Sequence, residues 1–255
     1  MSIALRKSLH IQNSVPQRSF GPFLLVHALP WLILAAAMRV LAFTGSGPAV
    51  VSEIVVASLA VLQAFLTTAQ RSIEAAGGDS RLAELDFARQ YRLSRAIFWR
   101  LALIMVAAAI ALALSGFTGA APHLLGGIDG MAFDQATALG KFWNAAIAVL
   151  VLLILVHAGQ NDGEVALFAA LGQFARRWFW FGGAAVVLGI TYIGLGVVQG
   201  FVRGAIWNFW QLSDASQFIK NLVFFVFIFS FAMLRLWMTL LILTFGLKRS
   251  YLSDD

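Results

Sequence analysis

Six long apolar runs constrain this sequence more than any other feature. Crossing the hydrocarbon core of a bilayer takes about 20 residues of helix, and each run is close to that length or longer. The runs are continuous rather than alternating, and lipid offers the backbone no hydrogen-bond partners, so each run is expected to be helical. The predicted spans are residues 23–43, 49–69, 97–117, 141–158, 179–199 and 218–246.

The composition supports this class of protein. Hydrophobic residues make up 60% of the 255 positions and charged residues 12%, against about 45–50% and about 25% in ordinary soluble domains. The first apolar run carries Arg39 and leads into further spans, which argues against a cleavable signal peptide. The sequence therefore predicts an all-α, polytopic integral membrane protein with a single transmembrane domain over residues 1–255.

Several kinds of chemistry are excluded or have no motif to support them. The chain has no cysteine, which rules out disulfides, thiolate metal sites and cysteine nucleophiles. It has no Walker-type phosphate loop, no HExxH and no Gly-x-Ser-x-Gly. The net charge of +6 does not predict nucleic-acid binding, because the basic residues lie at the predicted membrane edges. We therefore expect a protein that is not an enzyme and that has no cofactor, no metal and no nucleic-acid partner.

The distribution of Lys and Arg predicts the orientation, since cytoplasmic segments carry an excess of both. With the N-terminus inside, the inner segments hold twelve of these residues and the outer segments hold three. Both termini are then cytoplasmic, and a bacterial inner membrane is the expected location. The inner residues are Arg6, Lys7, Arg18, Arg71, Arg81, Arg89, Arg92, Arg95, Arg176, Arg177, Lys248 and Arg249, and the outer ones are Lys141, Arg203 and Lys220.

Two short segments are amphipathic and are predicted to lie on the cytoplasmic face. They cover residues 80–95 and 162–176. The chain also resembles itself faintly at an offset of 81 residues, and this match reflects either a common origin or coincidence. The matched positions are Phe87-Ala88 with Phe168-Ala169, Arg95 with Arg176, and Phe98-Trp99 with Phe179-Trp180. The predicted architecture is thus three two-span hairpins with interfacial helices on the cytoplasmic side.

The stretch HAGQNDGEVALF (157–168) gathers polar residues between the fourth span and the second amphipathic segment. Asn161 and Glu164 have the spacing of a capping box, in which each side chain binds a free backbone N–H at a helix start. Gly159 can end the preceding span. The cluster is therefore interpreted as the end of one helix and the N-cap of the next, in preference to a catalytic site.

Two opposite charges lie at similar depth on either side of the first outer turn. Arg39 precedes the turn TGSGP (44–48), and Glu53 follows it. Charges inside a membrane are costly and usually paired. The sequence predicts an intramembrane ion pair between Arg39 and Glu53, and a pair that couples to protons or ions is the functional alternative.

Arg235 lies deep within the last predicted span, where no acidic residue is evident at the same depth. Gln63 and His27 are the polar residues expected to face it. A buried guanidinium can bind an anionic solute or lipid headgroup, cap backbone carbonyls or pair with the carboxylate of a partner subunit. These three alternatives remain open, and Arg235, Gln63 and His27 form the candidate binding site.

The histidines suggest two weaker hypotheses. His27 and His157 lie on different spans in the same leaflet and could clamp a haem, although one histidine per helix is a common pattern. The loop APHLLGGIDGMAFDQ places His123, Asp129 and Asp134 where they could gather a cation, but its glycines favour a turn-rich loop.

These patterns give three functional hypotheses. The first is a structural or assembly protein, or the membrane subunit of a larger complex, with the bilayer around it and protein partners at its interfacial helices. The second is a translocator or permease for an anionic solute or lipid, with Arg235 as the contact. The third is a haem-binding membrane anchor.

Overall fold

The computed structural model describes residues 22–44, 47–75, 86–135, 137–161 and 163–252. Every regular element in these ranges is helical. Six helices are long and apolar enough to cross a membrane, in agreement with the six predicted spans. Their spanning parts are Leu25–Ala42, Ser52–Ile73, Phe87–Leu114, Ala138–Gly159, Trp178–Leu212 and Gln217–Arg249.

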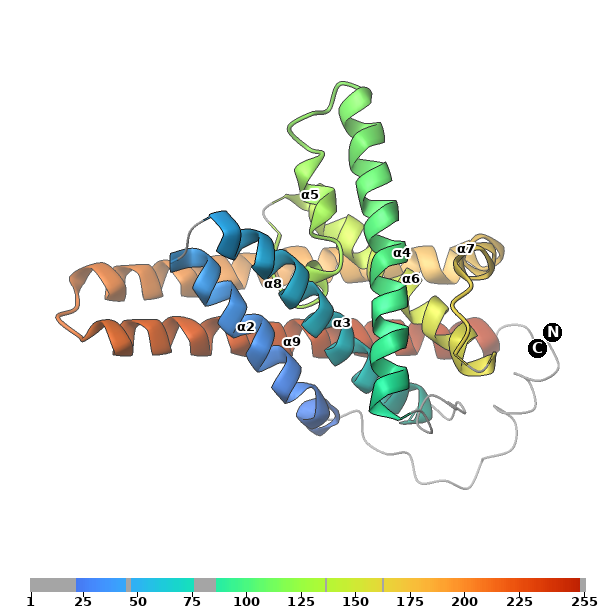
Figure 1. Ribbon diagram of the computed structural model, residues 1–255, viewed down its shortest axis with the longest axis horizontal. Coiled ribbons are helices and arrows are strands. Elements are labelled where there is room, and N and C mark those ends of the chain that lie inside the picture. The colour runs from blue at the N-terminus through green and yellow to red at the C-terminus, as the bar shows by residue number, and fades with distance from the viewer. Residues whose placement is uncertain (1–21, 45–46, 76–85, 136, 162, 253–255) are drawn as a thin grey trace.

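The elements follow one another along the chain as shown in Figure 1. The first span begins as a 3-10 helix and becomes α-helical next to Pro30, a residue tolerated in the first turn of a helix. The elements are η1 (Pro22–Ala28), α2 (Leu29–Thr44), α3 (Gly47–Ala75), α4 (Phe87–Leu114), α5 (Pro122–Leu125), η3 (Asp129–Met131), α6 (Ala138–Gln160), α7 (Leu167–Arg176), α8 (Trp178–Leu212) and α9 (Gln217–Leu252).

Helices α3 and α6 lie at the centre of the packing, and most of the residues in their spans are buried. Helix α2 packs against α3, and α8 packs against both α6 and α9. Helix α4 contributes fewer buried residues and carries exposed Leu103, Ile110 and Leu114 along its length. The larger of two buried apolar clusters draws on all six long helices, and the smaller one joins α4 to α5.

The first amphipathic segment differs from its prediction. Within the described part, it is no separate interfacial helix, because α4 runs without a break from Phe87 into the third span. Asp86 caps it by accepting a hydrogen bond from the Arg89 backbone N–H. The change from polar to apolar side chains leaves the backbone hydrogen bonds of the helix intact. Residues 80–85 lie outside the described residues.

The matching segment in the 81-residue comparison folds differently. Helix α7 ends at Arg176, and α8 begins at Trp178 after the non-helical Arg177. In Figure 1 α7 is seen nearly end-on, while α8 and α9 run across the view. One copy of the faint repeat is therefore a straight helix and the other a corner.

The predicted cap at Asn161 and Glu164 is wrong. Helix α7 begins at Leu167 with Ala166 at its N-cap, and no side chain caps it. Asn161 instead ends α6 as its C-cap, and its amide Nδ2 donates to the His157 carbonyl oxygen at 2.8 Å. A positive φ of 87° at Gly163 completes the turn, a conformation that glycine adopts without steric cost.

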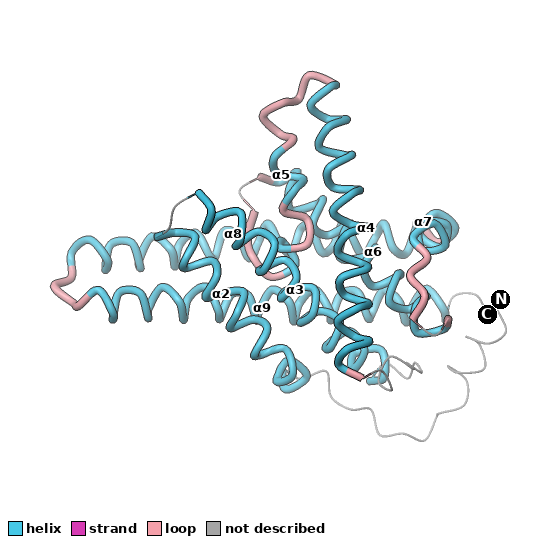
Figure 2. The backbone as a smooth tube through the Cα atoms, viewed as in Figure 1, coloured by secondary structure: helices cyan, strands magenta, loops and turns pink. Residues whose placement is uncertain are grey.

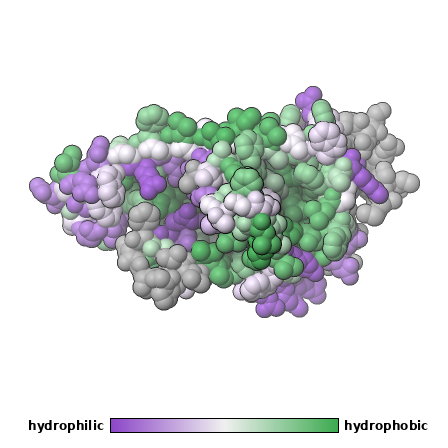
Figure 3. Space-filling view, turned by 90° about the horizontal axis from the view of Figure 1, so that it is seen from above, coloured by the Kyte–Doolittle hydropathy of each residue, from purple (hydrophilic) through white to green (hydrophobic). Residues whose placement is uncertain are grey.

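Helices α8 and α9 are longer than a bilayer requires. At 35 and 36 residues, each extends for more than about 50 Å at 1.5 Å per residue, whereas the hydrocarbon core is about 30 Å thick. Their connection extends beyond the other helices at the left of Figure 1. The same end is hydrophilic in Figure 3, and it contains Gln211, Asp214, Gln217 and Lys220.

Candidate functional site: a buried ion-pair cluster

The segment between α4 and α6 folds into the protein rather than lying on its surface. Residues 128–133, which we call the buried segment, are all buried. It packs against α3, α6 and α9, and Figure 2 shows it as loop and short helix among them. Its side chains include Ile128, Met131 and Phe133, which join the apolar core. Two acidic residues, Asp129 within it and Asp134 next to it, are thereby brought among the long helices.

The first part of the cluster is formed by Arg39, Glu53 and Asp129. The structure brings the predicted pair together, with Arg39 Nη1 3.1 Å from Glu53 Oε1. The same nitrogen also contacts the Asp129 carboxylate, a partner that the sequence did not suggest. The Arg39 guanidinium lies 4.9 Å from the centre of the Phe133 ring. Both carboxylates are buried and Arg39 is partly exposed, and a single guanidinium pairs with both of them.

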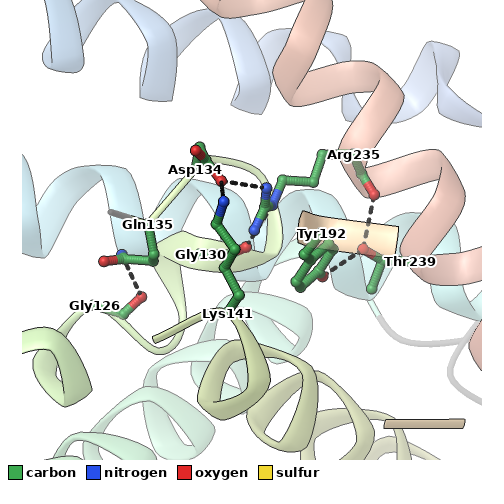
Figure 4. Close-up of polar contacts among 8 residues, drawn as sticks. All are labelled: Gly126, Gly130, Asp134, Gln135, Lys141, Tyr192, Arg235 and Thr239. Atoms are coloured by element: carbon green, nitrogen blue, oxygen red, sulfur yellow. Dashed lines mark hydrogen bonds and ion pairs between the residues drawn. The ribbon is translucent and has the colours of Figure 1, made fainter. Parts of the chain in front are cut away.

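Arg235 forms the centre of the second part, shown in Figure 4. Only 2% of this residue is exposed. Its Nε donates to the Gly130 carbonyl oxygen at 3.0 Å, and its Nη1 donates to Asp134 Oδ1 at 3.0 Å. The guanidinium carbon lies 3.8 Å from the centre of the Tyr192 ring, a cation–π distance. Arg235 thus joins α9, α8 and the buried segment.

Two further contacts complete this part. Lys141 Nζ lies 3.3 Å from Asp134 Oδ1, so one carboxylate oxygen serves two cations. Tyr192 and Thr239 share a hydrogen bond of 2.6 Å between their hydroxyl oxygens, and Thr239 Oγ1 donates to the Arg235 carbonyl oxygen. Lys141 was predicted to lie in an outer segment, but it is buried at the first turn of α6.

The cluster as a whole is neutral. Its three cations, Arg39, Lys141 and Arg235, are matched by Glu53, Asp129 and Asp134. Some buried polar atoms beside the ion pairs nevertheless have no partner among the described residues, namely Asp129 Oδ1, Arg235 Nη2 and both amide atoms of Asn144. The neutral total disfavours a bound ion, whereas the unpaired donors and acceptors can take part in further hydrogen bonds.

The predicted grouping of Arg235 with Gln63 and His27 requires correction. Asp134 supplies the carboxylate that the sequence did not reveal at the depth of Arg235. Gln63 is buried, but its Oε1 accepts a hydrogen bond from Ser94 of α4. The side chain of His27 is exposed. The contacts of Arg235 come from the buried segment, Asp134 and α8 instead.

The remaining histidine hypotheses gain no support from the geometry. The ring Nε2 of His157 accepts from the Asn161 amide at 3.2 Å, which occupies the nitrogen that a haem iron would use. Asp129 and Asp134, which were considered as cation ligands together with His123, are paired with Arg39 and Arg235. The loop composition alone did not reveal these pairings.

Gly130 is the position where the cluster tolerates least additional volume. A Cβ atom there would overlap the side-chain amide of Asn144. We expect Gly130→Ala to lower the stability by about 1–3 kcal/mol, as overpacking of a core does, measured as thermal unfolding in detergent. Gly194→Ala is the matched control, because a Cβ at Gly194 meets nothing within 4 Å. Equal unfolding midpoints for the two variants would contradict the placement of Gly130.

Comparison of this chain with protein-family models, curated proteins and solved structures finds no match in any of the three.

Proposed function

We propose that this chain is a non-enzymatic integral membrane protein that acts as a structural or assembly subunit, the membrane part of a larger complex. The observation that carries the proposal is the internal pairing of its buried charges. Arg39, Lys141 and Arg235 all neutralise carboxylates of the same chain. A binding site for an anion needs an uncompensated cation, whereas a stable scaffold needs its intramembrane charges paired.

The long helices α8 and α9 provide a surface for a partner. Near their connection, large apolar side chains are exposed, among them Phe201 at 78% and Phe218 at 74%. The connection of α8 and α9 extends beyond the other helices (Figure 1), and the high exposure of both side chains leaves them open to contact from another molecule. We propose that a partner subunit packs against this part of the hairpin.

The test measures both complex formation and transport. Purified in mild detergent from its source cell, the chain is expected to have a protein mass above the 27.7 kDa of one copy, with a second polypeptide present. Phe201→Gln combined with Phe218→Gln should reduce the complex to the single chain. Leu114→Gln, at a side chain 84% exposed at the end of α4, is the control and should leave the complex intact.

An anion translocator is the second candidate, and one observation favours it. Arg235 Nη2 and the Asn144 amide are buried without a partner among the described residues, and both side chains lie next to Gly130. They could bind a solute that passes through the cluster. Flux of chloride, phosphate or labelled phospholipid in proteoliposomes decides between the two. A single chain with flux above that of protein-free liposomes, and without a partner, refutes the scaffold proposal.

We further propose a bacterial inner-membrane location with both termini in the cytoplasm, three hairpins, and α7 as an interfacial helix. One observation supports this arrangement. In Figure 1 the ends of α3 and α6 and the start of α4 lie towards the lower right, and the end of α9 and the start of α8 lie at the right. The basic residues of the predicted inner segments lie near these ends, including Arg71, Arg89, Arg176 and Lys248.

Reporter fusions test this orientation. An enzyme that is active only outside the cytoplasm should be active when it is fused after Gly119, in the exposed loop that follows α4. The same enzyme fused after Ser253, which lies outside the described residues, should be silent. The opposite pair of results would invert every inside and outside assignment.

A further inference from the structure

The corner between α7 and α8 has features of a site for a lipid headgroup. Helix α7 turns Leu167 and Phe174 towards the core, but it leaves Phe168 87% exposed on its other side. Trp178 and Phe179, which begin α8, are also exposed, at 67% and 68%. Apolar and aromatic side chains at this density are unusual on a surface in contact with water, whereas Trp is enriched at the boundary between lipid and water.

The end of α9 adds positive charge to the same corner. Arg249 lies with its guanidinium carbon 5.9 Å from the centre of the Trp180 ring, which brings the last turns of α9 to the first turn of α8. The close approach of Gly246 to Ala184 fixes the same pair of helix ends, since a Cβ on Gly246 would lie 3.1 Å from Ala184 Cβ. Lys248, Arg249 and Arg176 are all exposed.

The charged residues of this corner are all basic. Residues 167–180 and 245–250 contain four basic residues, Arg176, Arg177, Lys248 and Arg249, and no acidic residue. A concentration of cations beside exposed aromatic rings matches the two halves of an anionic phospholipid. The phosphate and headgroup face the cations, and the acyl chains face Phe168 and its neighbours.

The direction of α7 relative to α8 and α9 is consistent with a bound phospholipid. It is seen end-on in Figure 1, where α8 and α9 lie in the plane of the page, so α7 crosses their axes steeply. If α8 and α9 span the bilayer, α7 lies along its surface, where amphipathic helices insert one face among the acyl chains. Groups of Lys and Arg beside the cytoplasmic ends of spans are features that bind anionic headgroups.

We propose that the corner formed by α7, the start of α8 and the end of α9 binds an anionic phospholipid, with Arg176, Lys248 and Arg249 on its headgroup and Phe168 on its acyl chains. This inference rests on the proposed membrane orientation of α7. It adds a lipid of stated charge to the partners of the proposed scaffold.

The test compares lipid retention by the purified full chain in nanodiscs that mix phosphatidylglycerol and phosphatidylcholine. Wild-type protein should retain phosphatidylglycerol preferentially when it is transferred into detergent and analysed by native mass spectrometry. Each basic residue near a charged surface changes lipid affinity about five-fold. The triple variant Arg176→Gln, Lys248→Gln, Arg249→Gln should therefore lose about 100-fold, and Phe168→Gln should weaken retention without abolishing the preference.

Arg203→Gln is the matched control, since Arg203 is an exposed Arg of α8 towards the opposite end of that helix. It should retain phosphatidylglycerol as wild type does, with equal unfolding midpoints for all variants. If the triple variant does not fold, the double variant Arg176→Gln, Lys248→Gln decides, with an expected loss of about 25-fold. Equal retention by wild type and the basic-residue variant overturns the proposal.

Two further results would also overturn it. Displacement of the lipid by millimolar inorganic phosphate would assign the corner to a free anion, and capture of a protein there in place of lipid would assign it to a partner. Lipid retention by the purified chain depends neither on which side of the membrane its termini face nor on whether it forms a complex with another protein. Failure of this inference is therefore distinguishable from failure of the proposed function.

Discussion

Arg39→Leu is expected to lower the stability of the protein by about 3–5 kcal/mol, the cost of leaving a buried charge unpaired. The reason is that one guanidinium serves two acids. Glu53 Oε1 lies 3.1 Å from Arg39 Nη1, and the Asp129 carboxylate contacts the same nitrogen. Without Arg39, two buried carboxylates face each other, and the buried segment loses its link to α2. Thermal unfolding in detergent measures the loss.

The two acids provide graded controls for this prediction. Glu53→Gln leaves Arg39 with Asp129, and Asp129→Asn leaves it with Glu53, so each should cost less than Arg39→Leu. The triple variant Arg39→Leu, Glu53→Gln, Asp129→Asn removes all the charge and should recover part of the stability. A triple variant less stable than Arg39→Leu alone would contradict the arrangement.

Arg235→Leu is expected to have the second largest effect, also about 3–5 kcal/mol. The substitution removes the hydrogen bond to the Gly130 carbonyl, one of the two cations at Asp134, and the contact with the Tyr192 ring. Lys141 remains on Asp134 and limits the loss. Unfolding in detergent should show a lower midpoint, and expression in the membrane should fall with it.

Arg235→Lys separates the shape of the side chain from its charge. A lysine keeps the charge near Asp134, but it has no planar fork to bind Gly130 and Asp134 together, so an intermediate loss is expected. Arg100→Leu is the control, because Arg100 is an exposed Arg of a spanning helix that donates to the Ala96 carbonyl. Equal stability of Arg235→Leu and Arg100→Leu would refute a structural role for Arg235.

The features that sequence predicted well are those set by local composition. A continuous apolar run needs only length to be identified as a helix that can cross a membrane. The Arg39–Glu53 contact was also predictable, since a short turn places residues equally distant from it at similar depth. Both inferences use neighbours in sequence and need no knowledge of how the helices pack.

The partners of Arg235 could not be predicted in this way. Asp134 is 101 positions away in sequence, in a segment interpreted as an outer loop. One signal was present, since IDGMAFD sets two acids within apolar residues as a buried segment would. Its glycines favour a turn-rich loop, whereas in the structure Gly130 allows the close approach of Asn144.

The helix ends show a second limit. Asn followed three positions later by Glu satisfies the pattern of an N-cap, but the same Asn fits a C-cap, where its amide donates to a carbonyl one turn earlier. The structure uses Asn161 in the second way. The pattern of side chains alone does not determine whether a polar residue caps the start or the end of a helix.

Cysteine labelling tests the central claim, that residues 128–133 lie inside the protein and are held there by ion pairs. The chain has no cysteine, so a single one can be introduced at Ala132, which is 1% exposed, or at Gly119, which is exposed. With a membrane-impermeant maleimide on folded protein, Gly119→Cys should label and Ala132→Cys should not, although both label in denaturant. Protection of Ala132→Cys should also be lost when Arg39→Leu is added. Labelling of Ala132→Cys in the otherwise unchanged folded protein at the rate of Gly119→Cys would contradict the account.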